Sequence, residues 1–271
     1  MRNLIAILLI FITLSSCSEF QKTLRSDDLV AKFKMGATLF EEGKFSKANK
    51  LFIQIVPKYR GKPQAQRLMY MYSKSFYELG DYYTANYQFE RFISAYPESD
   101  KLEESSFLAA KSYYYLSPRY SKEQKETIEA LEKLQRFINV YPESEYVAEA
   151  NTLVKELDLK LERKAYEIAL QYNETVPYTA DYNAAIAAFD KFLLEYPGSV
   201  FREDALYHRF ESAYGLAINS VQWKKEERLK KASEYLASLN KAYPESKYGD
   251  QTERMLKNIN EQLENYNTES K

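Results

Sequence analysis

The sequence predicts an all-α protein, a right-handed superhelix of about five similar helix pairs closed by a further helix at the C-terminus. One segment recurs four times: an amphipathic stretch, then Tyr-Pro, then a serine two residues after the proline, at Pro97, Pro142, Pro197 and Pro244. Apolar residues recur at three- and four-residue steps, which is the period of an amphipathic helix. Seven glycines and eight prolines in 271 residues are too few for a β protein rich in tight turns. Repetition of this kind is typical of solenoid proteins.

The chain begins with the features of a bacterial lipoprotein signal. Arg2 supplies a short positive region, and the apolar run over residues 4–14 is about half as long as the roughly 20 residues that a membrane-spanning helix needs. The run ends in Leu-Ser-Ser-Cys, and Cys17 is the only cysteine, so the chain has no internal disulfide bond. We expect a signal peptide at residues 1–16 and lipidation of Cys17. The alternative is an ordinary secretory signal in which Cys17 has no role.

Residues 17–28 are polar and aperiodic, which predicts a flexible lipidated tether. Asp27 or Asp28 would cap a helix that begins near Leu29. From there to residue 145 the pattern predicts three N-terminal repeats. An aromatic residue, an alanine and a second aromatic follow Gly43 and Gly80 at the same spacing: Phe45, Ala48 and Phe52, then Tyr82, Ala85 and Phe89.

These spacings, with small residues at Gly36 and Ser73 in the preceding helices, resemble the 34-residue tetratricopeptide repeat. Small residues there let two antiparallel helices pack closely. Tyr182, Ala185 and Phe189 repeat the pattern in a fourth copy. Each proline would end a helix, and the serine after it would cap the next.

Residues 146–265 are expected to form the C-terminal repeats and the capping helix. Polar insertions are predicted at residues 116–126, 173–180 and 219–227, because these stretches lack the helical apolar period. One long helix is expected over residues 145–172, shared by the third and fourth repeats. A closing helix is expected over 248–263, followed by a disordered tail at 266–271.

The composition argues against several functions. A net charge of −1 lacks the basic excess that nucleic-acid binding needs. His208 is the only histidine and lies in a predicted helix, and no glycine-rich phosphate loop is present. Carboxylates fall on helix surfaces beside lysines and arginines, as expected for solvated faces, and Glu104 is expected to be one of these exposed side chains. The sequence therefore predicts no catalytic residue, metal site or cofactor.

In tetratricopeptide arrays the first helix of each repeat lines a concave groove. The corresponding positions hold Val30, Phe33, Ala37, Phe40 and Glu41 in the first repeat and Arg67, Tyr70, Lys74, Tyr77 and Glu78 in the second. We predict a peptide-binding groove in which aromatic residues hold an apolar side chain and cations hold a carboxylate. Its residues are Phe33, Phe40, Arg67, Tyr70, Lys74 and Tyr77, of which the aromatic ones should be partly exposed. The alternative is that these aromatic residues pack between the helices as core.

The chain resembles the BamD family, the lipoproteins of the β-barrel assembly machine. The resemblance lies in the lipoprotein box, the five repeats that end in Tyr-Pro segments, and the closing helix. The resemblance covers the mature chain and is most specific over residues 117–150. It implies a lipid anchor at the periplasmic face of the outer membrane. It also implies C-terminal repeats that dock on the POTRA domains of a BamA-like barrel protein, and N-terminal repeats that bind C-terminal segments of unfolded barrel proteins. The stretch at residues 173–182 is longer than the tight glycine turn that the family usually has there.

The Tyr- and Lys-rich composition further suggests a Bacteroidetes-type member. The alternative function is that of a periplasmic repeat protein that coordinates cell-wall synthesis with envelope constriction. Such proteins usually carry a coiled coil before their repeats, whereas here the repeats follow the lipoprotein box by a dozen residues.

Overall fold

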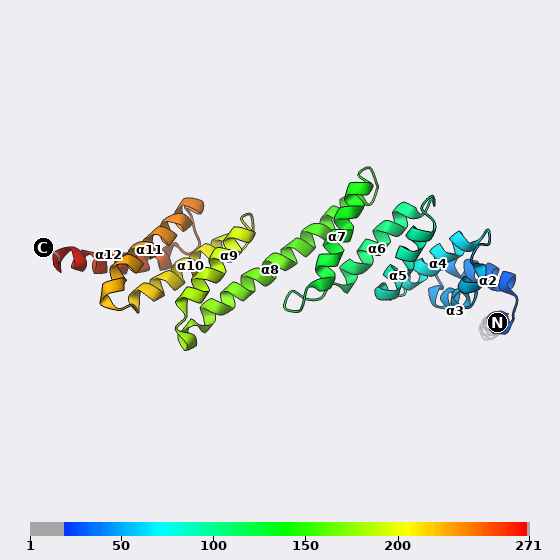
Figure 1. Ribbon diagram of the computed structural model, residues 1–271, viewed down its shortest axis with the longest axis horizontal. Helices are drawn as coiled ribbons and strands as arrows, with labels where there is room; N and C mark the ends of the chain where they lie inside the picture. The colour runs from blue at the N-terminus through cyan, green and yellow to red at the C-terminus, as the bar shows by residue number, and fades with distance from the viewer. Residues whose placement is uncertain (1–18, 270–271) are drawn as a thin grey trace, which may run out of the picture. The chain divides into compact units, whose positions relative to one another are not determined.

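The computed structural model describes residues 19–269, which form helices joined by turns and loops (Figure 1). Residues 19–25 are helical, and the order after them is α2 (Leu29–Glu41), α3 (Phe45–Ile55), the 3-10 helix η1 (Val56–Tyr59), α4 (Ala65–Glu78), α5 (Tyr82–Ala95), α6 (Leu102–Leu116), α7 (Lys125–Val140), α8 (Val147–Thr179), α9 (Tyr182–Glu195), α10 (Arg202–Ile218), α11 (Gln222–Ala242) and α12 (Gly249–Glu269). No strand occurs within residues 19–269. The predicted all-α fold of successive helix pairs, α2 with α3 through α10 with α11, is confirmed, and α12 follows as the closing helix.

The described residues form two compact units. The N-terminal unit contains the residues up to Pro118 and Lys122–Leu157, and the C-terminal unit contains Arg119–Ser121 and the residues from Asp158 onward. In the N-terminal unit one core lies around Phe52 and a second around Phe107. The C-terminal unit has one core around Phe192 and another around Phe210. Each unit therefore buries apolar surface of its own.

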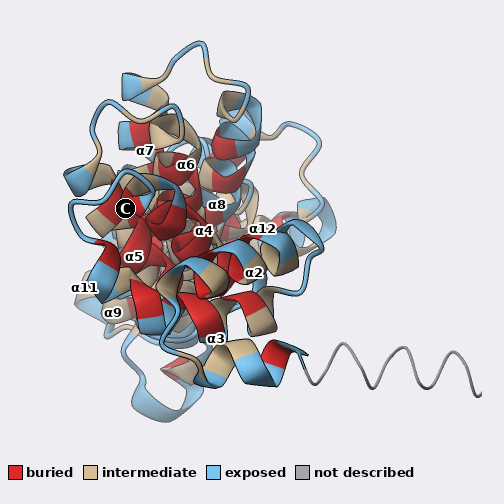
Figure 2. Ribbon diagram, turned by 90° about the vertical axis from the view of Figure 1, so that its right-hand side faces the viewer, coloured by how far each residue is buried: buried red, intermediate tan, exposed pale blue. Residues whose placement is uncertain are grey.

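Small residues bring the two helices of a pair together at the positions that the repeat pattern predicts. Gly36 on α2 faces Phe52 on α3, and a Cβ atom at Gly36 would lie only 2.5 Å from Cε1 of the ring. Between neighbouring pairs, Gly215 on α10 makes a similar close contact with Tyr182 on α9, which the sequence analysis did not single out. The repeat alanines have no exposed surface: Ala48, Ala85 and Ala185. In α2 and α3, buried and exposed residues alternate along each helix, as expected for amphipathic helices with one face on a core (Figure 2).

The four Tyr-Pro segments form the same turn. The tyrosine amide donates the last hydrogen bond of the preceding helix, and the proline after it cannot donate another. The serine hydroxyl accepts from the amide two residues on, and the serine carbonyl accepts from the amide three residues on. The serines therefore close the turn just before each helix, rather than occupying the N-cap position that the sequence suggested. They are Ser99, Ser144, Ser199 and Ser246.

The segment before the first repeat differs from the predicted flexible tether. Residues 19–25 form a helix, and Phe20 is 6% exposed with the Lys47 ammonium 5.6 Å from its ring centre. Two apolar side chains, Phe20 and Leu24, are too few to establish a helical period, yet burying one phenylalanine stabilises a contact by about 1.5–3 kcal/mol. Asp28 caps α2 as predicted, since its carboxylate accepts from the amides of Val30 and Ala31. The predicted signal peptide and Cys17 lie outside the described residues.

The long shared helix is confirmed, and α8 extends it to 33 residues. The insertion expected at 173–180 is wrong, because residues 173–179 are the last turns of α8. Val176 is buried there, and the Asn173 side chain donates to Ser212 Oγ on α10 at 2.8 Å, so this stretch packs on its neighbour. Pro177 is tolerated because it stands in the final turn, and the helix ends before Ala180, whose φ is +54°.

The remaining connections are close to their predicted places. The insertion after α6 is confirmed as a loop that ends where α7 begins at Lys125. Only residues 219–221 of the insertion expected at 219–227 are irregular, because α11 begins at Gln222. The tail expected to be disordered from residue 266 is helical through Glu269. Among the helices that the structure describes, none is both long and apolar enough to span a membrane.

Candidate peptide-binding groove

The N-terminal unit carries a groove between α2, α4, α5 and the turn that leads into α6. Its volume is about 530 Å³, and its walls combine apolar, cationic and acidic side chains. Three of the six predicted groove residues line it: Phe40, Arg67 and Tyr70. The other lining residues are Glu41, Pro63, Gln66, Met71, Phe92, Asp100 and Lys101.

Arg67 and Glu41 form an ion pair across the groove. The Arg67 guanidinium on α4 lies 2.9 Å from Glu41 Oε1 on α2, and both side chains are more than half exposed. Both residues come from positions that the repeat pattern placed in the groove. The pair therefore joins the first helices of the first and second repeats at the groove surface.

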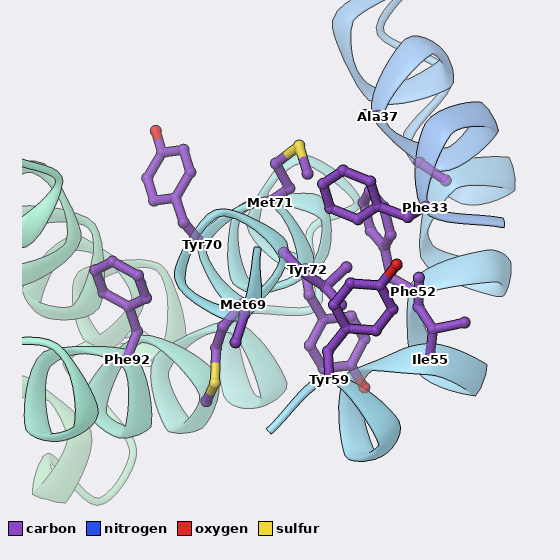
Figure 3. Packing of buried hydrophobic residues seen from close by; sticks show 13 residues of the cluster. Phe33, Ala37, Phe52, Ile55, Tyr59, Met69, Tyr70, Met71, Tyr72 and Phe92 are labelled. Carbon is purple, nitrogen blue, oxygen red and sulfur yellow. The ribbon is translucent and has the colours of Figure 1, made fainter. Parts of the chain in front are cut away.

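Tyr70 forms the boundary between the groove and the core. Its ring is 9% exposed and packs beside Phe92 of α5 with the ring centres 6.0 Å apart. Its hydroxyl points away from the other labelled core side chains (Figure 3). Lys74 and Lys101 lie over the ring at 5.7 and 5.4 Å from its centre, and the Lys74 ammonium donates to the hydroxyl at 3.2 Å. The ring therefore provides an apolar wall flanked by two cations.

Glu104 forms ion pairs with both of the lysines that lie over the Tyr70 ring. Its carboxylate lies 2.7 Å from Lys74 Nζ and 3.2 Å from Lys101 Nζ, and its side chain is largely buried. Burial alone would raise the pKa of Glu104, but the hydrogen bonds from Lys74 and Tyr70 lower that pKa below its usual value. Burial, with the hydrogen bond to Glu104, raises the pKa of Tyr70, so the hydroxyl stays protonated. The expectation that Glu104 is exposed was wrong. Glu104 lies on α6, and its contacts with Lys74 and Tyr70 of α4 bury its side chain between the two helices.

Of the other predicted groove residues, Lys74 lies beside the groove on the Tyr70 ring, whereas Phe33 and Tyr77 lie apart from it. Phe33 is 9% exposed and stacks on Tyr59, with the ring centres 5.6 Å apart, among the labelled core residues in Figure 3. Tyr77 is half-buried and contacts Tyr82 and Tyr115. Partial exposure is therefore confirmed for Phe40 and Tyr77 and wrong for Phe33 and Tyr70, because apolar rings on an inner helix face bury themselves when a neighbouring helix is close enough.

The structure adds residues that the sequence did not single out. Lys101 and Glu104 lie outside the first helices that the mapping covered, and their contacts with α4 span about 30 positions of the chain. A similar pair, Lys111 with Glu149 at 2.5 Å, joins α6 to α8. Ion pairs thus connect the first helix of each repeat in the N-terminal unit to that of its neighbour. No i, i+4 pattern within one helix could have indicated them.

The only histidine of the chain, His208, packs against other side chains of the C-terminal unit. His208 stacks on Phe189 with the ring centres 5.9 Å apart, and its Nδ1 lies 3.0 Å from Glu211 Oε2. Asn173 and Tyr207 also donate to Glu211, which makes this a closed polar network inside the C-terminal unit. Within residues 19–269, no group of three or more His, Cys, Asp or Glu side chains is placed to hold a metal ion.

Comparison with protein families gives the identity that the repeats suggested. The model of the YfiO family, described as outer membrane lipoprotein, matches residues 26–180 and 176–270, nearly all of the part that the structure describes. A search of curated proteins found no match. Two adjoining family matches of this length cover the helix pairs of both units. The chain therefore belongs to the YfiO family of outer membrane lipoproteins.

Proposed function

We propose that the protein is a lipid-anchored, non-enzymatic scaffold of the machinery that assembles β-barrel proteins in the outer membrane. Membership of an outer membrane lipoprotein family is the observation that carries this proposal. The anchor is Cys17, because a thioether-linked lipid needs a cysteine and the chain has no other. The body lies at the periplasmic face. Assignment to a Bacteroidetes-type branch stays a prediction from composition.

The groove of the N-terminal unit binds the C-terminal segments of unfolded barrel proteins. A chain end brings one carboxylate and usually an apolar or aromatic final side chain. The exposed Arg67–Glu41 pair is worth about 0–1 kcal/mol, so a ligand carboxylate can replace Glu41 at little cost. Lys74 is held by the largely buried Glu104 at 2.7 Å, and the half-exposed Lys101 also contacts Glu104, at 3.2 Å. Arg67 is therefore the main cation for the ligand, with Lys101 beside it. The final side chain rests against Phe40 and Tyr70.

Binding of a labelled peptide copied from the C-terminus of a barrel protein, followed by fluorescence anisotropy, tests this role. Arg67→Glu should weaken binding at least tenfold, because it replaces the cation by a like charge. Glu41→Gln should strengthen binding, since it removes the carboxylate that competes for Arg67. The same peptide with an amidated end should bind the parent more weakly.

Lys50→Glu is the matched control, because it makes the same charge change at an exposed position outside the groove. Its affinity for the peptide should stay within about twofold of that of the parent. If Arg67→Glu and Lys50→Glu weaken binding equally, only net charge matters, and the groove assignment is wrong. Equal affinity for free and amidated peptides would also contradict it.

The C-terminal unit docks on the POTRA domains of a BamA-like barrel protein. An apolar groove of about 480 Å³ between α8 and α9 supports this placement. Ile168 and Tyr172 of α8 are half-exposed at its rim, and alanines of α9 form its floor: Ala184, Ala187 and Ala188. Exposed apolar side chains gathered around a groove are typical of a protein interface. The two grooves lie in different units, so one partner need not exclude the other.

Affinity purification of the tagged full-length protein from mild detergent tests the partner. We expect a barrel protein with POTRA domains to co-purify. Ile168→Glu with Ala187→Glu should remove most of it, because two carboxylates would be buried without partners at the interface. The control pair, Leu194→Glu with Val200→Glu, introduces the same charges at exposed positions outside the groove and should retain it. Recovery of cell-wall synthesis enzymes in place of a barrel protein would favour the alternative function.

A further inference from the structure

The first repeat and the start of the second have an unusual charge. Residues 29–67 contain nine basic and two acidic side chains, a net charge of +7. The whole chain has 38 basic and 39 acidic residues, so all other residues together carry a net charge of −8. The basic residues are Lys32, Lys34, Lys44, Lys47, Lys50, Lys58, Arg60, Lys62 and Arg67.

Most of this positive charge is exposed and not neutralised by the fold. Lys44 and Arg67 pair with the only two carboxylates of the segment, Glu42 and Glu41. Five further cations are exposed and form no ion pair with any residue that the structure describes: Lys34, Lys50, Lys58, Arg60 and Lys62. They are distributed over α2, α3, η1 and the turn after it. A terminal repeat needs a polar outer face for solubility, but mixed charges would provide that equally well.

The same repeat lies next to the proposed lipid anchor. Phe20 is buried beside α3, where Lys47 covers its ring. Three Cα-to-Cα steps lead from Cys17 to Phe20 and span at most about 11 Å. A lipid on Cys17 therefore holds α3 close to the bilayer surface, whatever path the intervening chain takes. A long flexible tether would have imposed no such constraint.

We infer that the basic first repeat binds the anionic headgroups of the bilayer into which the lipid on Cys17 inserts. This inference rests on the anchor in the proposed function and not on the barrel-protein partners. Lysines and arginines near an anionic bilayer are attracted by its surface potential, which extends about one Debye length into the solution. The half-exposed apolar side chains Val30 and Ile53, on the same helix pair, can enter the interface beside them. The lipid supplies attachment, and the cations fix which face of the N-terminal unit meets the membrane.

Flotation with lipid vesicles tests the inference without acylation or partners. The probe is the mature chain from residue 17 with Cys17→Ser, which contains every described residue. It should float with vesicles of phosphatidylethanolamine and phosphatidylglycerol, and not with vesicles of phosphatidylcholine alone. Binding should disappear in about 1 M salt, where the Debye length falls to about 3 Å. Flotation that ignores lipid charge or salt would overturn the inference.

Matched variants locate the binding surface. Lys34→Glu, Lys50→Glu and Lys58→Glu together should lower vesicle partitioning at least tenfold. Lys230→Glu, Lys241→Glu and Lys257→Glu make the same charge change at exposed positions of the C-terminal unit and should leave it within about threefold. Equal loss in both variants would mean that net charge alone acts. Circular dichroism checks that both are folded, and peptide affinity should be unchanged in both, because none of these residues lines the groove.

A tryptophan reporter gives a second readout that needs no charge reversal. Trp223 is the only tryptophan of the chain, so Trp223→Phe with Ile53→Trp leaves one on the exposed face of α3. Its emission should shift to shorter wavelength with anionic vesicles and stay unchanged with phosphatidylcholine. The parent, with Trp223 in the C-terminal unit, should show no shift in either case. Absence of a shift at position 53 would show that this face does not meet the membrane.

Discussion

Glu104 is the residue on which the charge arrangement of the candidate groove depends. Its carboxylate accepts from Lys74 and Lys101, and after burial its hydrogen bond is the next cause of the raised pKa of Tyr70. Because the pKa of Glu104 in the folded state is lowered, its contribution to stability is present above the usual carboxylate value of 4.5. That contribution is lost as the pH falls through the lowered folded value.

Glu104→Gln should therefore destabilise the protein by about 1–3 kcal/mol at neutral pH, because charged hydrogen bonds to Lys74 and Lys101 are lost. The difference between variant and parent should shrink as the pH falls from 4.5 through the lowered folded value, because the parent carboxylate then becomes protonated too. Urea unfolding at neutral pH and at an acid pH below that folded value measures it. Glu98→Gln, at an exposed position, should change the free energy of unfolding by less than about 0.5 kcal/mol at either pH. A loss for Glu104→Gln that is the same at both pH values would contradict this account.

A residue could be assigned to the groove from the sequence where its position within the repeat is enough to place it on the groove surface. Phe40 and Arg67 follow from their places on the first helices, because repeats of one kind present the same positions to the same surface. Lys101 and Glu104 do not follow, since their partners on α4 are about 30 residues away and depend on how the second repeat packs on the third. Phe33 and Tyr70 were ambiguous because an apolar ring on an inner helix face suits a groove and a core equally well.

Among the elements, helix pairs with strong local signals were predicted well. Glycines and alanines at the crossing points and the Tyr-Pro turns identified α2 to α5, α9 and the shared helix α8. The prediction failed for two stretches, because contacts with other helices determine their helical structure. Residues 19–25 are held by one buried phenylalanine, and residues 173–179 continue α8 past a proline because Val176 and Asn173 pack on α10. Neither contact leaves a period in the sequence.

For the whole molecule, the main prediction concerns the proposed lipid anchor on Cys17. Cys17→Ser should abolish incorporation of a radioactive fatty acid, because no other thiol exists to carry the lipid. The variant should be recovered as a soluble or uncleaved species with the helical content of the parent, since the cores lie in residues beyond Phe20. Electrophoresis with autoradiography and circular dichroism measure the two effects. Equal labelling of variant and parent would exclude Cys17 as the lipid site.

The four Tyr-Pro turns also bear on how chains of this kind change over generations. Each turn is closed by hydrogen bonds within its own few residues, and the four copies share the bond from the tyrosine amide and the two bonds to the serine. A recombination event between two copies would therefore join a helix of one repeat to the following helix of another and keep every one of those bonds. Gene duplication and loss at these junctions should change the length of such a protein by whole helix pairs. Insertions of other lengths should be found in the loops within a pair, as between α6 and α7.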